Sequence, residues 1–120
     1  MKGKRGYIMR ARATSVDETR RRILVATRDL MFRAKLGAVV QAAGAEATRD
    51  EAAADLVVLD VAAPGAVERI RGLVGQGVAV LAYGPHVQAE LLRAAREAGA
   101  TAVPNSQVED QLRRSIFPAP

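Results

Sequence analysis

Four short polar segments follow apolar runs in this 120-residue sequence and hold the side chains that could do chemistry. They are Thr27-Arg28-Asp29, Asp60, Tyr83-Gly84-Pro85-His86 and Pro104-Asn105-Ser106. A carboxylate that is partly desolvated at a strand end needs a partner, and Arg28 could give Asp60 a charge-assisted, bidentate bond. Such a pair would hold the Arg28 guanidinium at the site as a permanent positive charge. The alternative is that Arg28 points into solvent and that Asp60 caps the loop after it.

The remaining polar residues restrict the chemistry further. His86 is the only histidine and there is no cysteine, which excludes histidine-based metal clusters, thiolate zinc sites and disulfides. His86 could face Asp60 in a pH-sensitive contact, or it could be a surface or capping residue. Asn105 and Ser106 are first of all helix caps, because Ser106 opens a Ser-x-x-Glu capping box. No glycine-rich phosphate-binding motif is present.

Alternating strands and helices must position these segments. Apolar, β-branched runs predict strands over residues 23–26, 45–48, 56–60, 78–82 and 100–103. Helical spacing of apolar residues predicts helices over residues 30–43, 66–74, 87–98 and 107–116, whereas residues 50–54 allow a turn or two at most. The predicted inward faces of the two middle helices are Val67, Ile70 and Val74, then Val87, Leu91, Ala94, Ala95 and Ala98. The first strand is apolar throughout, which predicts cover on both faces.

This order of elements predicts an α/β fold. Buried strands that alternate with amphipathic helices form a parallel sheet with helices on both faces, and right-handed crossovers leave few topologies. We expect a three-layer, doubly wound, five-stranded sheet in the flavodoxin-like order 2-1-3-4-5, with a shortened second helix. Ligands of such sheets bind beyond the carboxyl ends of the strands, here between strands 1 and 3.

The basic charge is concentrated at the start of the chain. Residues 1–22 contain eight Lys and Arg against two acidic residues, although the net charge of the whole chain is only +5. We therefore expect a basic extension over residues 1–20, partly disordered or forming one short helix, before a domain over residues 21–117. We expect no nucleic-acid binding except through this extension, whose basic charge could also simply belong to a solvated segment. No apolar run reaches the roughly 20 residues of a membrane span, and we expect a cytoplasmic protein.

Three segments resemble the receiver domains of bacterial response regulators. Arg22–Val25 is similar to the first receiver strand, Asp55–Gly65 to the phospho-acceptor segment D-L-V-L-L-D-x-x-M-P-G, and Leu91–Ala100 to the E-A-G-A that precedes the fifth strand. The resemblance covers residues 22–116 and implies that Asp60 occupies the phospho-acceptor position.

The other positions of the receiver site depart from that family. The resemblance puts Thr27 and Arg28 where receivers carry the acidic pair that holds magnesium, and Asp29 is the only carboxylate nearby. It puts Ala82 at the position of the Ser or Thr at the end of strand 4, and Ser106 at the position of the Lys after strand 5. Tyr83 is one position away from the aromatic switch residue, so we do not assign that role to it.

The expected function follows from these departures. We expect a degenerate receiver, or pseudo-receiver: a non-catalytic signalling or protein-interaction module without magnesium-dependent phosphorylation and without a cofactor. The resemblance implies that partners, a second copy among them, dock on the face made by residues 87–98, 100–103 and 107–116. Four arginines would make that face basic in part: Arg93, Arg96, Arg113 and Arg114.

Two alternatives stay open at this point. One is a functional phospho-receiver that uses Asp60, with Asp29 alone recruiting the metal ion. The other is a small flavodoxin-like domain that binds an anionic metabolite through Arg28, His86 and the N-terminal ends of helices. Tyr83 and Asn105 are further candidates for contacts with such a ligand.

Overall fold

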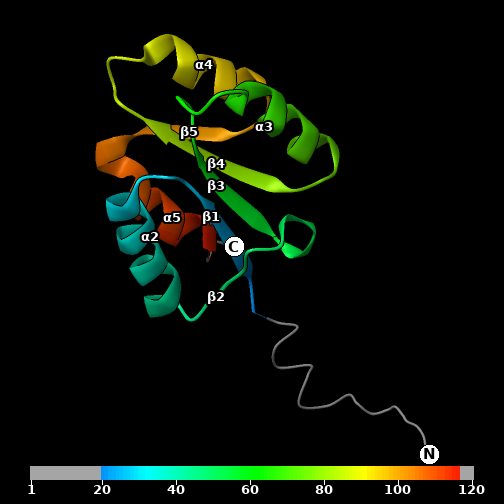
Figure 1. Cartoon of the computed structure of the whole chain (residues 1–120), viewed down its shortest axis with the longest axis vertical. Coiled ribbons are helices and arrows are strands. Elements are labelled where there is room, and N and C mark those ends of the chain that lie inside the picture. The colour runs from blue at the N-terminus through cyan, green and yellow to red at the C-terminus, as the bar shows by residue number, and fades with distance from the viewer. Residues whose placement is uncertain (1–19, 117–120) are drawn as a thin grey trace, which may run out of the picture.

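Five parallel strands form one sheet in the computed structural model, which describes residues 20–116 (Figure 1). The strands are β1 (Arg22–Ala26), β2 (Glu46–Ala47), β3 (Leu56–Asp60), β4 (Ala79–Gly84) and β5 (Thr101–Pro104). Their order in the sheet is β2-β1-β3-β4-β5, which confirms the predicted topology. The predicted extension over residues 1–20 lies almost wholly outside the described residues.

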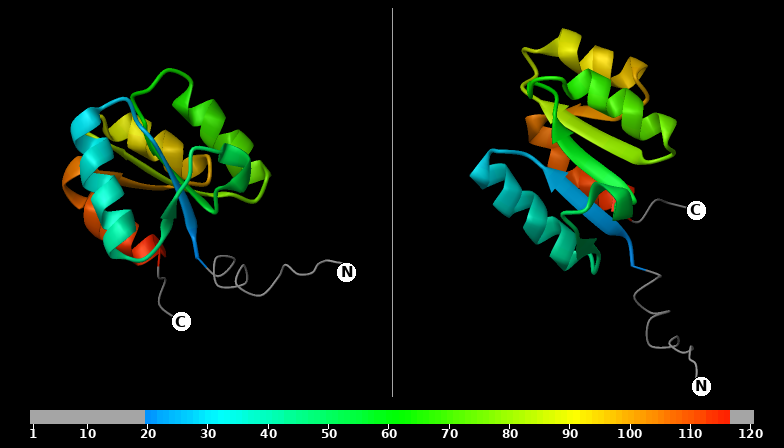
Figure 2. Two further views of the ribbon diagram at one scale, coloured as in Figure 1. Left: turned by 60° about the horizontal axis from the view of Figure 1, so that its bottom comes forward. Right: turned by 45° about the vertical axis from the view of Figure 1, so that its right-hand side comes forward.

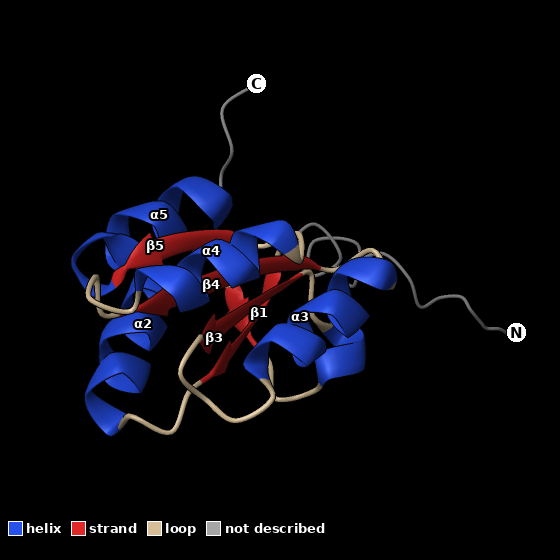
Figure 3. Ribbon diagram, turned by 90° about the horizontal axis from the view of Figure 1, so that it is seen from above, coloured by secondary structure: helices blue, strands red, loops and turns tan. Residues whose placement is uncertain are grey.

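Helices cover both faces of the sheet, which confirms the three-layer architecture (Figure 2). The α-helices are α2 (Leu30–Ala42), α3 (Ala66–Gly75), α4 (Ala89–Glu97) and α5 (Val108–Ile116). Helices α2 and α5 lie on one face, and α3 and α4 lie on the other (Figure 3). Among residues 20–116, no helix is both long and apolar enough to cross a membrane.

Each face of the sheet has its own aliphatic core. Side chains of a strand alternate between faces, so Val58 and Leu81 pack toward α2 and α5 while Val57 and Val80 pack toward α3 and α4. The first four residues of β3 are all buried. Burying one side chain of this kind contributes about 1.5–3 kcal/mol, so the central strand anchors both layers.

The helix faces were predicted only in part. In α3, Ala66, Ile70 and Leu73 are buried, whereas the predicted Val67 and Val74 are only half-buried.

In α4 the predicted face was right only in part, because the helix begins at Ala89 and buries the predicted Ala95 together with Leu92, which was not predicted. Val87 is 77 % exposed and Leu91 37 % exposed. Alanine-rich helices offer several nearly equivalent apolar stripes, so spacing alone does not single out the one that faces the core.

The segment between β2 and β3 contains only a short 3-10 helix, η1 (Glu51–Ala53), as the sequence predicted. Asp50 caps it by accepting a bond from the Ala52 N–H at 3.0 Å. No full helix therefore covers the neighbouring part of the sheet, and of the five residues in β1 only Ile23 is buried. The prediction that β1 is covered on both faces therefore holds only in part: its side chains pack against both cores, but most of them are half-buried.

Candidate functional site

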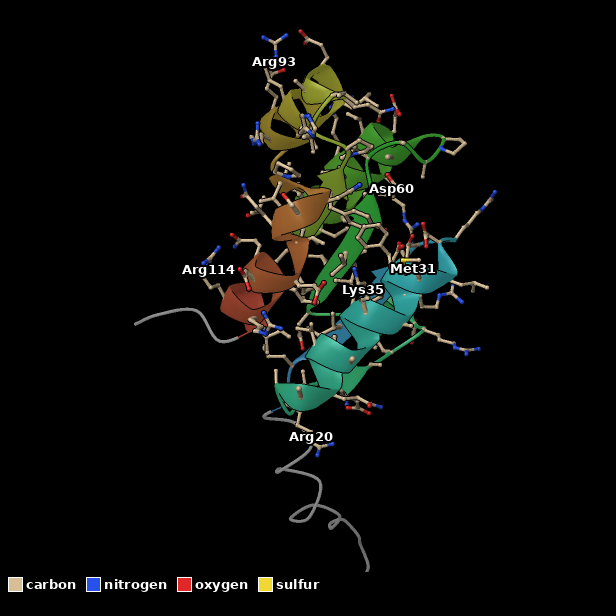
Figure 4. All side chains as sticks on the ribbon, turned by 90° about the vertical axis from the view of Figure 1, so that its left-hand side faces the viewer. Arg20, Met31, Lys35, Asp60, Arg93 and Arg114 are labelled. Atoms are coloured by element: carbon tan, nitrogen blue, oxygen red, sulfur yellow. The ribbon has the colours of Figure 1, made fainter. Side chains whose placement is uncertain are left out.

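A cavity of about 440 Å³ opens at the carboxyl ends of β1 and β3. This is the place where the sheet topology predicted a site. Figure 4 shows Asp60, at the end of β3, and Met31, in the first turn of α2, on the same right-hand side of the view. The cavity is lined by Ala26, Thr27, Arg28, Asp29, Arg33, Asp60, Ala62, Ala63, Pro64 and Arg69.

Asp60 is held by the backbone of the loop that follows it. Its Oδ1 accepts a hydrogen bond from the Ala62 N–H at 2.9 Å. Among residues 20–116, neither Asp60 nor Arg28 takes part in an ion pair, and Arg28 is exposed. The predicted pair of Arg28 with Asp60 was therefore wrong. Because the turn already supplies a donor to the carboxylate, Asp60 does not need the cation that we expected it to recruit.

The Thr27 hydroxyl forms a buried hydrogen bond with Tyr83. The Tyr83 hydroxyl donates to Thr27 Oγ1 at 2.7 Å, and the Asp29 N–H donates to the same oxygen at 3.2 Å. Tyr83 is 1 % exposed, and its ring packs on Phe32 with the centroids 4.9 Å apart. A side chain from β4 thus reaches across β3 and ties the end of β1 to the centre of the sheet.

The strand β4 extends two residues beyond its predicted end, and this changes the roles of two candidates. Tyr83, predicted to lie in a loop, is in register with Asp60, whereas Ala82 is in register with Leu59. Ala82 is fully buried in the core under α3 and α4. It does not line the cavity, so the structure moves it away from the site where the resemblance had put it.

The other predicted residues also lie outside the cavity lining. His86 is exposed in the loop between β4 and α4, and no hydrogen bond or ion pair of the described residues joins it to Asp60. Ser106 is exposed in a second 3-10 helix, η2 (Asn105–Gln107), and α5 begins only at Val108, so the predicted capping box does not form. The Asn105 Oδ1 is buried without a hydrogen-bond partner among residues 20–116.

Two arginines that we did not select from the sequence line the cavity. Arg33 Nη2 donates to the Thr27 carbonyl at 2.7 Å. Arg69, in the first turns of α3, donates to Glu51 Oε1 from Nη2 at 2.7 Å and from Nε at 3.2 Å. Arg33 could have been found, because it is four residues after the helix cap Asp29 and so lies one turn above it. The sequence carries no such signal for Arg69.

The buried position of Tyr83 changes its acid–base behaviour. Removal from water raises the pKa of its hydroxyl above 10.0; the hydrogen bond to Thr27 opposes this, and the negative charges of Asp60 and Asp29 add to it. The folded protein therefore holds the phenolic proton to a higher pH than the unfolded chain does.

We expect the free energy of unfolding to fall as the pH rises above about 10, and to fall less steeply in Tyr83→Phe. Below the unfolded pKa both states are protonated, so the contribution of Tyr83 is complete. Above that pKa, Tyr83 ionises first in the unfolded state, and this ionisation stabilises the unfolded state relative to the folded one. Urea unfolding of both proteins near pH 9 and near pH 11 measures the difference. An equal loss in the two proteins would contradict the assignment.

Comparisons with known proteins agree with this architecture. No family model and no curated protein matches the sequence. Among solved structures, the chain is similar to a response regulator receiver protein from Burkholderia phymatum, with 22 % identity, a TM-score of 0.65, and coverage of 81 % of this chain and 92 % of that one.

Two further solved structures match to a similar extent. The signal receiver domain of the putative response regulator NarL from Mycobacterium tuberculosis has 19 % identity and a TM-score of 0.62, over 82 % of this chain and 94 % of that one. The CheY-like receiver domain protein from Methanospirillum hungatei has 14 % identity and a TM-score of 0.59, over 78 % and 94 %. The chain therefore has the fold of the response-regulator receiver domains.

Proposed function

We propose that the chain is a signalling and protein-interaction module that is not switched by magnesium-dependent phosphorylation of Asp60. The observation that carries this proposal is the environment of Thr27 and Arg28, the two positions that resemble the acidic pair of receivers. The Thr27 hydroxyl is bound to Tyr83, and Arg28 contributes a positive charge to the cavity. This leaves Asp60 as the only residue of the usual set.

The donor set of the cavity does not fit a magnesium ion. Mg²⁺ requires near-octahedral oxygen ligands, usually from one or two carboxylates and several waters. The carboxylates here are Asp29 and Asp60, and Asp29 Oδ1 already accepts bonds from the first N–H groups of α2. Three guanidinium groups line the same space and repel a cation. In residues 20–116, no cluster of three His, Cys, Asp or Glu is suited to hold a metal ion.

We also propose that the described residues have no enzymatic activity and that the module acts in the cytoplasm. In the cavity, the one hydroxyl nucleophile, Thr27, is hydrogen-bonded to a phenol and to a backbone N–H, neither of which is a general base. The absence of cysteine is compatible with a reducing compartment.

The proposed docking face is formed by α4, β5 and α5. Its predicted basic character is weakened by local pairs, because Arg93 binds Glu90 and Arg113 binds Asp110. Arg96 donates from Nε and Nη2 to the carbonyl of Ala102, at 3.1 and 2.8 Å. Two apolar side chains are exposed there instead, Val87 in the loop just before α4 and Leu91 within the helix. A protein partner, or a second copy of this chain, would gain more from these apolar contacts than from charge.

A backbone-amide NMR titration with Mg²⁺ and beryllofluoride, a mimic of the phosphoryl group, tests the proposal. We expect no saturable shifts around Asp60 in the wild type or in Asp60→Asn, because the metal has no ligand set and the acceptor is held by its own turn. An active receiver domain titrated in parallel shows that the reagent is competent. Saturable shifts that appear in the wild type and vanish in Asp60→Asn would identify a functional phospho-receiver and overturn the proposal.

A further inference from the structure

A second cavity, along β1, adjoins the cavity at Asp60. The second cavity has a volume of about 370 Å³ and shares Ala26 and Arg33 with the first. Its remaining lining residues are Ile23, Leu24, Val25, Gly37, Ala47, Thr48 and Arg49. We call the two together the β1 groove.

The β1 groove exists because β2 ends early. The β1–β2 ladder runs from the Glu46 N–H bond on the Arg21 carbonyl to the Thr48 N–H bond on the Ile23 carbonyl. Among the hydrogen bonds of residues 20–116, none continues this ladder to Val25. With only η1 after β2, neither a longer strand nor a full helix fills the space beside β1.

Four arginines from four separate segments line the β1 groove. Arg28 comes from the loop after β1, Arg33 from α2, Arg49 from the loop after β2, and Arg69 from α3. The only acidic residues in the lining are Asp29 and Asp60, and both accept backbone N–H bonds. The groove is therefore net positive, and its acidic groups are already engaged.

Two of these guanidinium groups already hold oxygen atoms at short range. Arg69 binds Glu51 with two N–H groups, and Arg33 binds the Thr27 carbonyl. The side chains of Arg69 and Glu51 are 44 % and 45 % exposed. An ion pair so exposed contributes little to stability, so an incoming oxyanion can take the place of Glu51 at small cost. Arg28 and Arg49 are exposed, and no hydrogen bond or ion pair of residues 20–116 involves either.

We propose that the β1 groove binds a small phosphate monoester of nucleotide size, held by arginine without a metal ion. The planar guanidinium fork matches phosphate oxygens in a bidentate manner, and Arg28 and Arg69 would grip the phosphate beside Asp60. The aliphatic part of the groove, at Leu24 and Ala47, would take the organic portion. Each cavity falls in the range of about 300–1,000 Å³ that small-molecule sites occupy. The inference rests on the proposed function, since Arg28 stands at one of the two positions that resemble the metal-binding acidic pair of receivers.

Amide NMR titrations of the full chain in EDTA test this inference, with adenosine monophosphate, inorganic phosphate and adenosine as separate probes. We expect saturable shifts at residues 27–33 and 48–51 with the monophosphate, weaker ones with inorganic phosphate, and none with adenosine. Arg28→Gln and Arg69→Gln should each weaken the binding of adenosine monophosphate by about tenfold, as loss of a charge-assisted bond implies. Arg71→Gln is the matched control, because Arg71 is exposed on the same helix as Arg69 and does not line the groove.

Three results would overturn the inference: no saturable shift with either phosphate probe, equal binding of adenosine, or equal weakening by Arg71→Gln. None of them affects the proposed function, which fails only through the response to Mg²⁺ and beryllofluoride.

Discussion

Replacement of Tyr83 by alanine should lower the free energy of unfolding by about 3–5 kcal/mol, the range for removal of a large buried aromatic ring. The ring is 1 % exposed and packs on Phe32, so its loss leaves a cavity between the sheet and α2. Tyr83→Phe keeps the ring and removes only the hydroxyl that donates to Thr27. We expect a loss of about 1 kcal/mol for that variant, the net value of one hydrogen bond.

Urea unfolding of the three proteins at neutral pH separates the two contributions. Domains of this size have a total stability of about 5–15 kcal/mol, so the alanine variant loses a large share of it. If that variant does not fold, Tyr83→Phe still reports on the bond to Thr27. A phenylalanine variant as stable as the wild type would show that this bond does not tie β1 to β4.

Gly84→Ala should lower the free energy of unfolding by about 1–3 kcal/mol, the usual cost of overpacking a core. A Cβ atom at position 84 would lie 2.6 Å from Cγ2 of Val61, which is itself buried. The close approach arises because the end of β4 passes directly beside the residue that follows β3. Gly72→Ala is the control, since a Cβ there meets nothing within 4 Å and alanine favours a helix.

A double-mutant cycle with Val61→Ala shows whether the clash is the cause. Truncation of Val61 removes the atom that a methyl group at position 84 would strike. The double variant should therefore lose less stability than the sum of the two single variants. Strict additivity of the two losses, measured by urea unfolding, would contradict the steric explanation.

The topology could be predicted because its signals are local and strong. The run Leu56–Asp60 is apolar up to its last residue, and such a run is stable only between two helical layers. Asp29 and Gly44 mark the two ends of α2: Asp29 accepts the Met31 and Phe32 N–H groups, and Gly44 follows the helix with φ +76°. Strand order then follows from few allowed crossovers.

The candidate site was less predictable because its contacts join distant parts of the chain. The bond between Tyr83 and Thr27 spans 56 positions, and the bond between Arg69 and Glu51 spans 18. Spacing along the sequence contains no information on such pairs. The expected partner of Asp60 was wrong for the opposite reason, because a local turn to Ala62 satisfies the carboxylate before any distant residue is needed.

The contact of Arg96 with Ala102 has a consequence for how molecules of this protein meet one another. Ala102 belongs to β5, an edge strand, and edge strands expose peptide groups on which a second chain can nucleate cross-β growth. The Arg96 guanidinium already donates two hydrogen bonds to the Ala102 carbonyl. The opposite edge strand, β2, is only two residues long. The two edges of the sheet therefore offer fewer free peptide groups to a strand of a second chain.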